Sequence, residues 1–518
     1  MSITGTDTWF GQPKGLTVLF LTEMWEKFSF FGMRALQIYY MIKQLHFSQA
    51  DASLVYGLYA GGVYLTPIVG GYIADRWLGR RRAIIGGGLL MALGHFTLAS
   101  EALFFPGLAL IAIGNGLFLP NLPSQVGDLY AAGDPRRGGA YNVYYVGINL
   151  GALLAPLVCG TLGEVYGWHV GFGAAGIGMI LGLLQFLWGQ KYLHGHAEPP
   201  KPLARGTELK IYGVGLLCLV PVAALMWAVA NHAFALGGEV SLAQLLMLLV
   251  MTGFMVWFTW YVLRECTQVQ RQQMITLLVL IFMCLVYFTM YEQTYGSWVT
   301  FTDRLLTKDI MPSMVIHEGK QWPWSTVSLV MAPASFMFSA WLSDRYPRSS
   351  LPKWLFVSAF VLMMVFLARD MVSLPQNASS LTYLSGPFIL ALAPIFSVLW
   401  GWLDRRGMNP SKPAKSAIGL MFAGLSFIPL ALAAQQAGAT GAQASVWWLV
   451  LTYGVMEIGE MCLSPVGLSA VTQLSVPRVV SLMMGTWFLA TAFSETLAAA
   501  FGKLAALDKE LPAGGVLL

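Results

Sequence analysis

Four ionisable side chains gather in the first strongly apolar segment of the chain. The stretch E-M-W-E-K-F-S-F-F-G-M-R places Glu23, Glu26, Lys27 and Arg34 within an otherwise apolar run. At 3.6 residues per turn, these residues project within roughly 100° of the circumference of a helix. Each would cost about 2.5 to 3.5 kcal/mol at the centre of a bilayer, so we expect them to pair and to face a wet cavity.

Two acids beside two bases suit the coupling of a proton to a second ligand. A carboxylate that is held by Lys27 or Arg34 releases this cation when it takes up a proton, and the released cation can then bind a substrate carboxylate. The alternative is a structural cluster of ion pairs that only locks helix packing. We favour the functional interpretation because buried ion pairs add little stability by themselves.

The composition identifies the chain as a membrane protein. Of its 518 residues, 57% are hydrophobic and 11% are charged, whereas roughly 25% are charged in a soluble domain. The apolar runs approach the ~20 residues that a membrane-crossing helix needs, and they lack the alternation of a barrel strand. The basic residues behind the net charge of +5 crowd particular loops, which topology explains, so we expect no nucleic-acid partner.

Alternating loop charge predicts the topology of the first part of the chain. Basic segments follow the second and fourth apolar runs, at 75–82 and 134–137, and predict cytoplasmic loops. The N-terminus lacks the basic region and cleavage site of a signal peptide, so we expect it to be cytoplasmic in a multi-pass protein of a bacterial inner membrane. The first six predicted spans lie near 16–43, 50–76, 81–100, 106–131, 138–160 and 167–191.

The remaining sequence predicts a linker, two additional spans and a second bundle. A Pro-rich polar segment follows the sixth span. Two apolar runs near 211–235 and 241–263 then predict an inserted hairpin, and the next run begins near 275. We therefore predict an all-α membrane protein with an amino-terminal bundle, a linker carrying a transmembrane hairpin, and a carboxy-terminal bundle. The predicted domains are 1–192, 193–273 and 274–518.

No pattern in the sequence points to an enzyme, a metal site or a bound cofactor. The five cysteines are far apart, without metal-ligand spacing, and are expected to be free buried thiols. The patterns G-x-S-x-G and H-E-x-x-H and a P-loop are absent, and the seven histidines are scattered. Without an ATP-binding segment, we expect an ion gradient to drive any accumulation, with protons as the coupling ion.

Several motifs together resemble one family. The segment Glu23–Arg34 resembles the E-x-x-E-R-F-S-Y-Y-G-M-R signature of the proton-dependent oligopeptide transporters of the major facilitator superfamily. The segments G-G-Y-I-A-D-R, Y-V-G-I-N-L-G-A-L and G-E-M-C-L-S-P-V-G are also similar, and the resemblance covers nearly the whole chain. It implies two six-helix-type bundles, and a monomeric symporter that imports di- and tripeptides with protons by alternating access.

The resemblance also implies roles for individual residues. The proton-coupling group would consist of Glu23, Glu26, Lys27 and Glu292. The peptide-binding group would consist of Arg34, Tyr64, Asn149, Glu460, Ser464 and Trp487. Within it, Arg34 would take the carboxylate of the peptide and Glu460 its amine, since a zwitterion needs a cation and an anion at opposite ends of its site. Helix packing is an equal alternative for Tyr64 and Asn149.

The chain departs from the family pattern at several points. Phe30 and Phe31 replace tyrosines of the signature, and Leu119 replaces a lysine of many members. Two more spans than expected lie between Glu292 and the segment P-S-K-P-A-K. Beyond the span that contains Trp487, the sequence lacks the expected last helix, which fits either an early end or a truncated sequence. A carrier of another anion or zwitterion, such as nitrate or an amino acid, is the alternative within transport.

Overall fold

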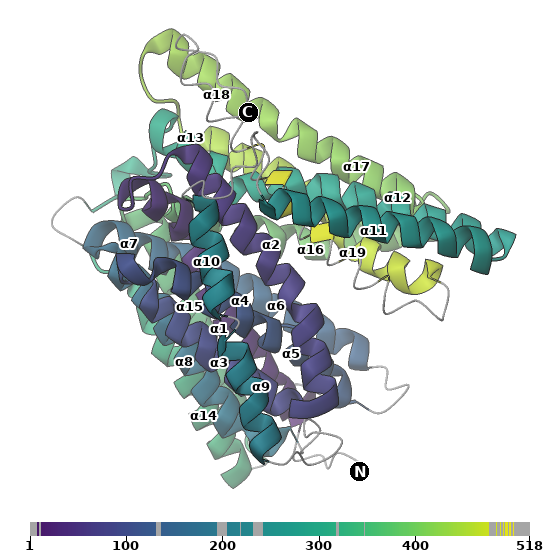
Figure 1. The fold of residues 1–518 in the computed structure, drawn as a ribbon. Coiled ribbons are helices and arrows are strands. Elements are labelled where there is room, and N and C mark those ends of the chain that lie inside the picture. Colours follow the sequence, from purple (N-terminus) through teal and green to yellow (C-terminus); the bar gives the residue numbers. More distant parts are fainter. Residues whose placement is uncertain are drawn as a thin grey trace. The chain divides into compact units, whose positions relative to one another are not determined.

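The computed structural model is almost entirely helical (Figure 1). It describes residues 8–9, 12–130, 136–193, 205–217, 219–230, 242–316, 321–346 and 348–475, and scattered positions from 483 to 501. In this part of the chain the only strands are β1 (Thr8–Trp9) and β2 (Gln12–Pro13), which pair antiparallel. The predicted all-α class is therefore confirmed.

Many of the helices are long and apolar enough to cross a membrane. Among the described residues, nine helical segments meet this condition by length and composition. The first helix, α1 (Lys14–Lys43), has 30 residues and carries the charged signature segment in its middle. These helices confirm the expected multi-pass membrane protein, because a bilayer admits a spanning chain only where its backbone bonds close internally.

The chain divides into two units by its internal contacts. The first takes its residues from Met1–Tyr40, Thr66–Ala223 and Lys308–Gly386, and the second from Met41–Leu65, Ala224–Thr307 and Pro387–Leu518. The helices α2 (Gln49–Ile73) and α10 (Leu219–Ala230) contribute residues to both units, and α1 and α16 (Ser385–Arg405) cross the division by two or three residues. The division into domains 1–192, 193–273 and 274–518 stays a prediction.

The first unit contains most of the amino-terminal helices and one later helix pair. Besides α1, its helices are α3 (Arg80–Thr97), α4 (Phe104–Phe118), α5 (Asn121–Asp128), α6 (Arg136–Ala155), α7 (Thr161–Tyr166), α8 (Trp168–Trp188), α9 (Arg205–Leu217), α14 (Ser328–Arg345) and α15 (Leu351–Ser373). Small residues let several of them pack closely, as at α3 and α4, where a Cβ on Gly87 would lie 2.5 Å from the carbonyl oxygen of Gly114.

One end of the α14–α15 pair is tied to amino-terminal elements by ionic contacts. Lys14 Nζ, at the start of α1, donates to Asp344 Oδ1 at 2.7 Å. The hydroxyl of Tyr192, just after α8, donates to Asp344 Oδ2 at 2.8 Å. Lys14 is only 2% exposed, and a buried cation needs such a partner. The α14–α15 pair is thus bound to the beginning of α1 and to the end of α8.

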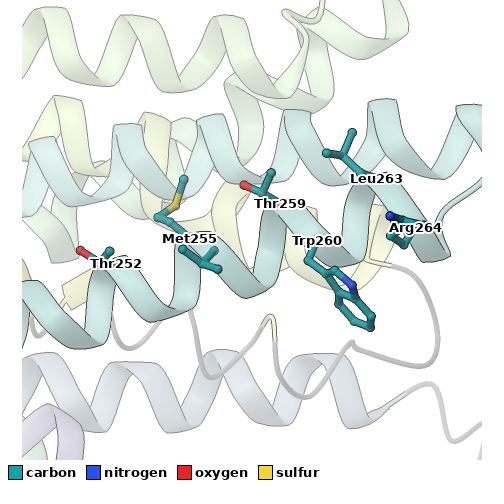
Figure 2. A pocket seen from close by; sticks show the side chains of 7 residues that line it. Thr252, Met255, Thr259, Trp260, Leu263 and Arg264 are labelled. Atoms are coloured by element: carbon teal, nitrogen blue, oxygen red, sulfur yellow. The ribbon is translucent and has the colours of Figure 1, made fainter.

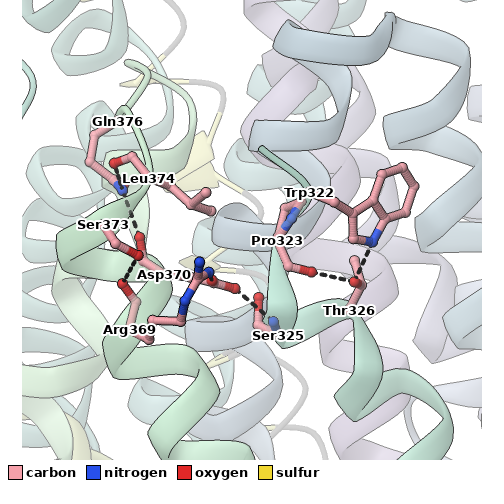
Figure 3. A network of polar contacts seen from close by, with 9 residues as sticks. All are labelled: Trp322, Pro323, Ser325, Thr326, Arg369, Asp370, Ser373, Leu374 and Gln376. Carbon is pink, nitrogen blue, oxygen red and sulfur yellow. Dashed lines mark hydrogen bonds and ion pairs between the residues drawn. The ribbon is translucent and has the colours of Figure 1, made fainter. Parts of the chain in front are cut away.

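The other end of the α14–α15 pair is closed by the polar network of Figure 3. The buried carboxylate of Asp370 accepts a hydrogen bond from the backbone N–H of Ser325 at 2.6 Å and pairs with Arg369 at 2.9 Å. The Arg369 guanidinium also lies 4.5 Å from the ring centre of Trp324. Gln376 Nε2 donates to the carbonyl oxygen of Asp370 at 3.1 Å. Asp370 therefore joins α15 to the turn that begins α14.

The second unit is built from the later helices of the chain. They are α11 (Leu242–Glu265), α12 (Gln268–Tyr291), α13 (Ser297–Leu305), α16 (Ser385–Arg405), α17 (Lys412–Leu425), α18 (Phe427–Thr440) and α19 (Trp447–Leu474). A capping box of Thr267 and Gln270 begins α12, which satisfies two backbone N–H groups of its first turn. The Leu306–Ala444 bridge joins the segments after α13 and before α19.

The cysteine prediction holds for the residues that the structure describes. Cys159, Cys266, Cys284 and Cys462 are free and buried. Cys218 lies outside the described residues. Among the described residues, no group of three or more His, Cys, Asp or Glu side chains could hold a metal ion.

Candidate functional site

The charged face of α1 forms a compact buried cluster. Lys27 Nζ lies 2.7 Å from Glu26 Oε2 and 3.4 Å from Glu23 Oε1. The two glutamates are 0% and 1% exposed, and the side chain of Lys27 is 12% exposed. One lysine thus contacts two buried acids, and a proton taken up by either acid would change the charge balance of the group.

A close approach of α6 to α1 places further polar groups beside this cluster. A Cβ on Gly151 would lie 2.2 Å from the carbonyl oxygen of Met24, and one on Gly147 would lie 2.7 Å from that of Phe20. These glycines, four residues apart on α6, provide the small surface that two membrane helices need to approach. On the same helix, the hydroxyl of Tyr144 donates to Glu23 Oε2. The contact of the two helices therefore builds the site.

Arg34 lies two turns beyond Lys27 on α1 and is 1% exposed. Its guanidinium lies 5.3 Å from the ring centre of Phe30, and Lys27 Nζ lies 5.8 Å from the same ring. Phe30 therefore contributes the face of its ring to both cations, where the family signature has a tyrosine. A cation over an aromatic ring is stabilised without a hydroxyl, so this departure keeps a favourable environment for both bases.

The predicted peptide-backbone contacts differ in their surroundings. Asn149 is buried in α6, and its amide donates to the carbonyl oxygen of Tyr145 at 2.8 Å. Its N–H group thus bonds within its own helix. Tyr64 is half-buried in α2 and belongs to the second unit. Asn149 shares the first unit with the α1 cluster, whereas Tyr64 does not.

The second unit has its own group of buried acids. Glu292 directly follows α12 and is 4% exposed, whereas Glu457 and Glu460 lie on α19 and are 0% and 8% exposed. The spacing of three residues places Glu457 and Glu460 on one face of α19, and their carboxyl groups interact. The charge of Glu292 also acts on Glu460. The structure thus brings together two predicted residues and one for which the sequence predicted no role.

Tight helix packing positions these acids. A Cβ on Gly459, directly before Glu460, would lie 2.8 Å from the carbonyl oxygen of Gly419 on α17. The hydroxyl of Tyr287 on α12 donates to the carbonyl oxygen of Met456 on α19 at 3.0 Å. Three helices of the second unit therefore meet at the turn of α19 that carries Glu457 and Glu460.

The last two predicted site residues are described only in part. Ser464 belongs to α19, one turn beyond Glu460, but its side chain lies outside the described residues. Trp487 is buried, with 5% of its surface exposed. The side-chain pockets predicted for these two residues stay a prediction.

Sequence reasoning missed two polar groups near α1. Tyr144 was not expected at the cluster, although its spacing from Gly147 and Gly151 places it on the face of α6 that meets α1. The buried ring of His95 lies 2.6 Å, through Nε2, from Ser29 Oγ on α1. A single histidine in an apolar run gave no signal of this contact, because the partners are 66 residues apart.

A pocket on α11 is not a candidate for the site. Its volume is about 550 Å³, and Figure 2 shows that its lining side chains follow one face of this single helix. They include Met255, Thr259 and Trp260, at helical spacing. A surface supplied by one helix cannot enclose a ligand, whereas small-molecule sites bury most of their ligand.

The fold and the buried charges in its spans define the chain as a polytopic membrane transporter. The chain belongs to the POT family, whose model, PTR2, matches residues 81–317 and 357–514. It is 32% identical over 514 residues to the uncharacterized transporter YclF of Bacillus subtilis, covering 97% of this chain and 89% of that protein. It is 31% identical to a di-/tripeptide transporter of Lactococcus lactis subsp. lactis, covering 95% and 89%.

Solved structures agree with this assignment. A peptide transporter POT in complex with sulfate is 31% identical and has a TM-score of 0.72, covering 96% of this chain and 89% of that one. A POT family transporter in complex with 5-aminolevulinic acid is 26% identical and has a TM-score of 0.75, covering 97% and 93%. The predicted family, the major facilitator type of fold and the assignment to transport rather than to enzymes are confirmed.

The family match also bears on the two spans in excess of the family pattern. The stretch 318–356 is not matched by the family model. It contains the whole of α14 and the beginning of α15. The α14–α15 pair lies between Glu292 and the segment P-S-K-P-A-K, where the sequence has two more spans than expected.

Proposed function

We propose that this chain is a monomeric, proton-coupled symporter that imports di- and tripeptides across a bacterial inner membrane by alternating access, with its N-terminus in the cytoplasm. The observation that carries the proposal is the contact of one cation, Lys27, with two buried acids, Glu23 and Glu26. The names of relatives that are peptide transporters support the substrate class.

The proton step follows from the charge of the α1 cluster. When Glu26 takes up a proton, it loses its attraction for Lys27, whereas Glu23 keeps its own. The redistribution of charge changes the relative stability of two conformations of the carrier. Glu292 would contribute a second acid to the same coupling from the second unit.

Recognition of the peptide would use charges of opposite sign. Arg34 would bind the terminal carboxylate through its planar guanidinium, and Glu460 would bind the terminal amine. Tyr64 and Asn149 would bond to the peptide backbone, and Ser464 and Trp487 would line the pockets for its side chains. The charge of Glu292 that acts on Glu460 supports this assignment, because an ammonium group relieves the repulsion between buried acids.

Uptake into proteoliposomes tests the coupling. We expect labelled dialanine to accumulate under an inward proton gradient. Glu26→Gln should abolish this accumulation but retain the exchange of peptide between the two sides without a gradient, because it removes the proton site and not the peptide contacts. Glu265→Gln is the matched control, since it makes the same change at an exposed glutamate at the end of α11. If Glu26→Gln lost both accumulation and exchange, or kept both, Glu26 would not have the proposed role in proton coupling.

Blocked peptides test the two recognition charges separately. A charge-assisted hydrogen bond contributes about 1.5 to 3 kcal/mol, so amidation or N-acetylation of dialanine should weaken its binding to the wild type by roughly 10- to 150-fold. Arg34→Ala should no longer distinguish the amide from the free carboxylate but should still reject the acetylated amine. Glu460→Gln should show the opposite pattern. Equal loss for every ligand in both variants would refute the assignment of the two ends.

A compact zwitterion that is not a peptide is a second candidate substrate. The observation that favours it is the relative that was solved with 5-aminolevulinic acid. Competition of this compound with dialanine in the same vesicles separates the two possibilities. We expect unlabelled dialanine to inhibit the uptake of labelled dialanine more strongly than 5-aminolevulinic acid does. The opposite order would favour a compact zwitterion that is not a peptide as the substrate.

A further inference from the structure

A long groove on the first unit is separate from the charged cluster. It has a volume of about 970 Å³ and is lined by residues of α2, α3 and α4 and of α9 and α10. Small-molecule sites range from about 300 to 1,000 Å³, so this groove is large for a site. Five helices contribute side chains to its lining, whereas a single helix supplies the pocket on α11.

The groove is apolar along most of its length. Its walls include Ile73, Leu89, Leu93, Val214 and Val222. The hydroxyl of Thr66, which also lines the groove, donates to the carbonyl oxygen of Ala112 at 2.8 Å and is therefore satisfied within the protein. The body of an occupant must consequently be hydrocarbon, because a polar group there would lose its hydrogen bonds to water.

One end of the groove is basic and aromatic. Lys210 and Trp77 line it, and Trp77 is 39% exposed. Arg81 lies on α3 one turn before Ile85, another lining residue, and so faces the same side of the helix. Among the described residues that line the groove, none is acidic. Tryptophan and basic side chains are typical of the membrane interface, so this end has the composition of a headgroup site.

We propose that the groove binds an anionic phospholipid. Its phosphate contacts Lys210 and Arg81, and one acyl chain lies along α3 and α9. Between Ile85 and Leu93 the groove follows about 12 Å of helix axis, a length that suits a chain and not a small soluble anion. The lipid fills the space between α9 and the helices α2 to α4, and so attaches α9 to the other helices of the first unit.

Two glycines on α9 provide a matched test of the acyl-chain site. Gly215 lines the groove, whereas Gly213 is not one of the lining residues, and a Cβ at either position would meet no atom within 4 Å. Gly215→Phe should fill the groove, and Gly213→Phe is the control for the same change on the same helix. The measurement is the number of phosphatidylglycerol molecules that native mass spectrometry finds on the purified full chain after incubation with phosphatidylglycerol or phosphatidylcholine.

The headgroup site has its own control. Each basic residue near anionic lipid should contribute about fivefold to the affinity, so Lys210→Gln and Arg81→Gln should each weaken phosphatidylglycerol binding by about this factor. Lys353→Gln, a lysine change on α15 outside the groove, should not. Phosphatidylcholine binding should stay weak in every variant.

Three results would overturn the proposal. In the first, the wild type retains phosphatidylglycerol and phosphatidylcholine equally. In the second, Gly215→Phe retains as much phosphatidylglycerol as the wild type does. In the third, Lys210→Gln and Lys353→Gln change phosphatidylglycerol binding equally. If Gly215→Phe does not fold, as judged by its thermal unfolding, the comparison of Lys210→Gln with Lys353→Gln decides alone. The result does not depend on the transported substrate, because none of the lining residues belongs to the proposed peptide or proton sites.

Discussion

Substitution of Gly151 by alanine tests whether the approach of α6 to α1 builds the charged site. The new Cβ would lie 2.2 Å from the carbonyl oxygen of Met24 and 2.9 Å from Cβ of Lys27. Ordinary contacts begin at 3.4 Å, so the first distance is 1.2 Å too short. Because the contacted atom belongs to the backbone of α1, no change of rotamer can relieve the contact, and the helices must separate.

Two opposing effects set the size of the change. Overpacking in a close-packed interior costs about 1 to 3 kcal/mol, and a rigid backbone contact belongs at the upper end of this range. Alanine regains about 1 kcal/mol through its higher helix propensity. We therefore expect the free energy of unfolding to fall by about 2 kcal/mol. Transport should fall further, because the separation also moves Tyr144 away from Glu23.

The control is Gly173→Ala in α8, where a Cβ would meet no atom within 4 Å. This variant should be as stable as the wild type or more stable, by up to about 1 kcal/mol. Thermal unfolding in detergent and peptide exchange in vesicles measure the two effects for both variants. If Gly151→Ala unfolds and transports like Gly173→Ala, then the close contact does not create the site.

Three further changes test other contacts. Tyr144→Phe removes the hydroxyl that donates to Glu23, should reduce proton-driven uptake by the equivalent of about 1 to 3 kcal/mol, and would contradict the site if uptake stayed unchanged. Asp344→Asn leaves the buried Lys14 without its carboxylate partner and should lower the midpoint temperature of thermal unfolding. An unchanged midpoint would show that this ion pair does not stabilise the fold. Asp370→Ala leaves the backbone N–H of Ser325, in the turn that begins α14, without its acceptor, and should lower the free energy of unfolding by about 1 to 3 kcal/mol. Proteolysis at this turn should therefore be faster in the variant, and equal cleavage of wild type and variant would refute this prediction.

The α1 cluster could be predicted because its residues are close in the sequence. Helical periodicity alone places Glu23, Glu26 and Lys27 on neighbouring positions of one face, and the cost of unpaired charge in a membrane requires them to pair. The structure has both short contacts. The same reasoning places Tyr144 on one face of α6 with Gly151. It could not predict the contact with Glu23, because the sequence does not say which helix packs against that face.

The attachment of the α14–α15 pair could not be predicted. Lys14 and Asp344 are 330 residues apart, and periodicity carries no information over such a separation. The sequence placed Asp344 within the predicted carboxy-terminal bundle, 274–518. Its place in the first unit depends on tertiary contacts of Asp344 and of Tyr192, which satisfy a cation that the sequence presents simply as the start of a span.

The buried acids of the second unit bear on the choice among substrates. The carboxyl groups of Glu292 and Glu460 are both buried there, and the charge of Glu292 acts on Glu460, so a proton or a nearby cation would relieve their repulsion. A simple anion such as nitrate would add to this repulsion. The ammonium end of a peptide would relieve it, while its carboxylate would still find Arg34. The proposed zwitterionic substrate would therefore meet a buried cation and a buried acid, whereas a simple anion would meet an unfavourable charge at Glu460.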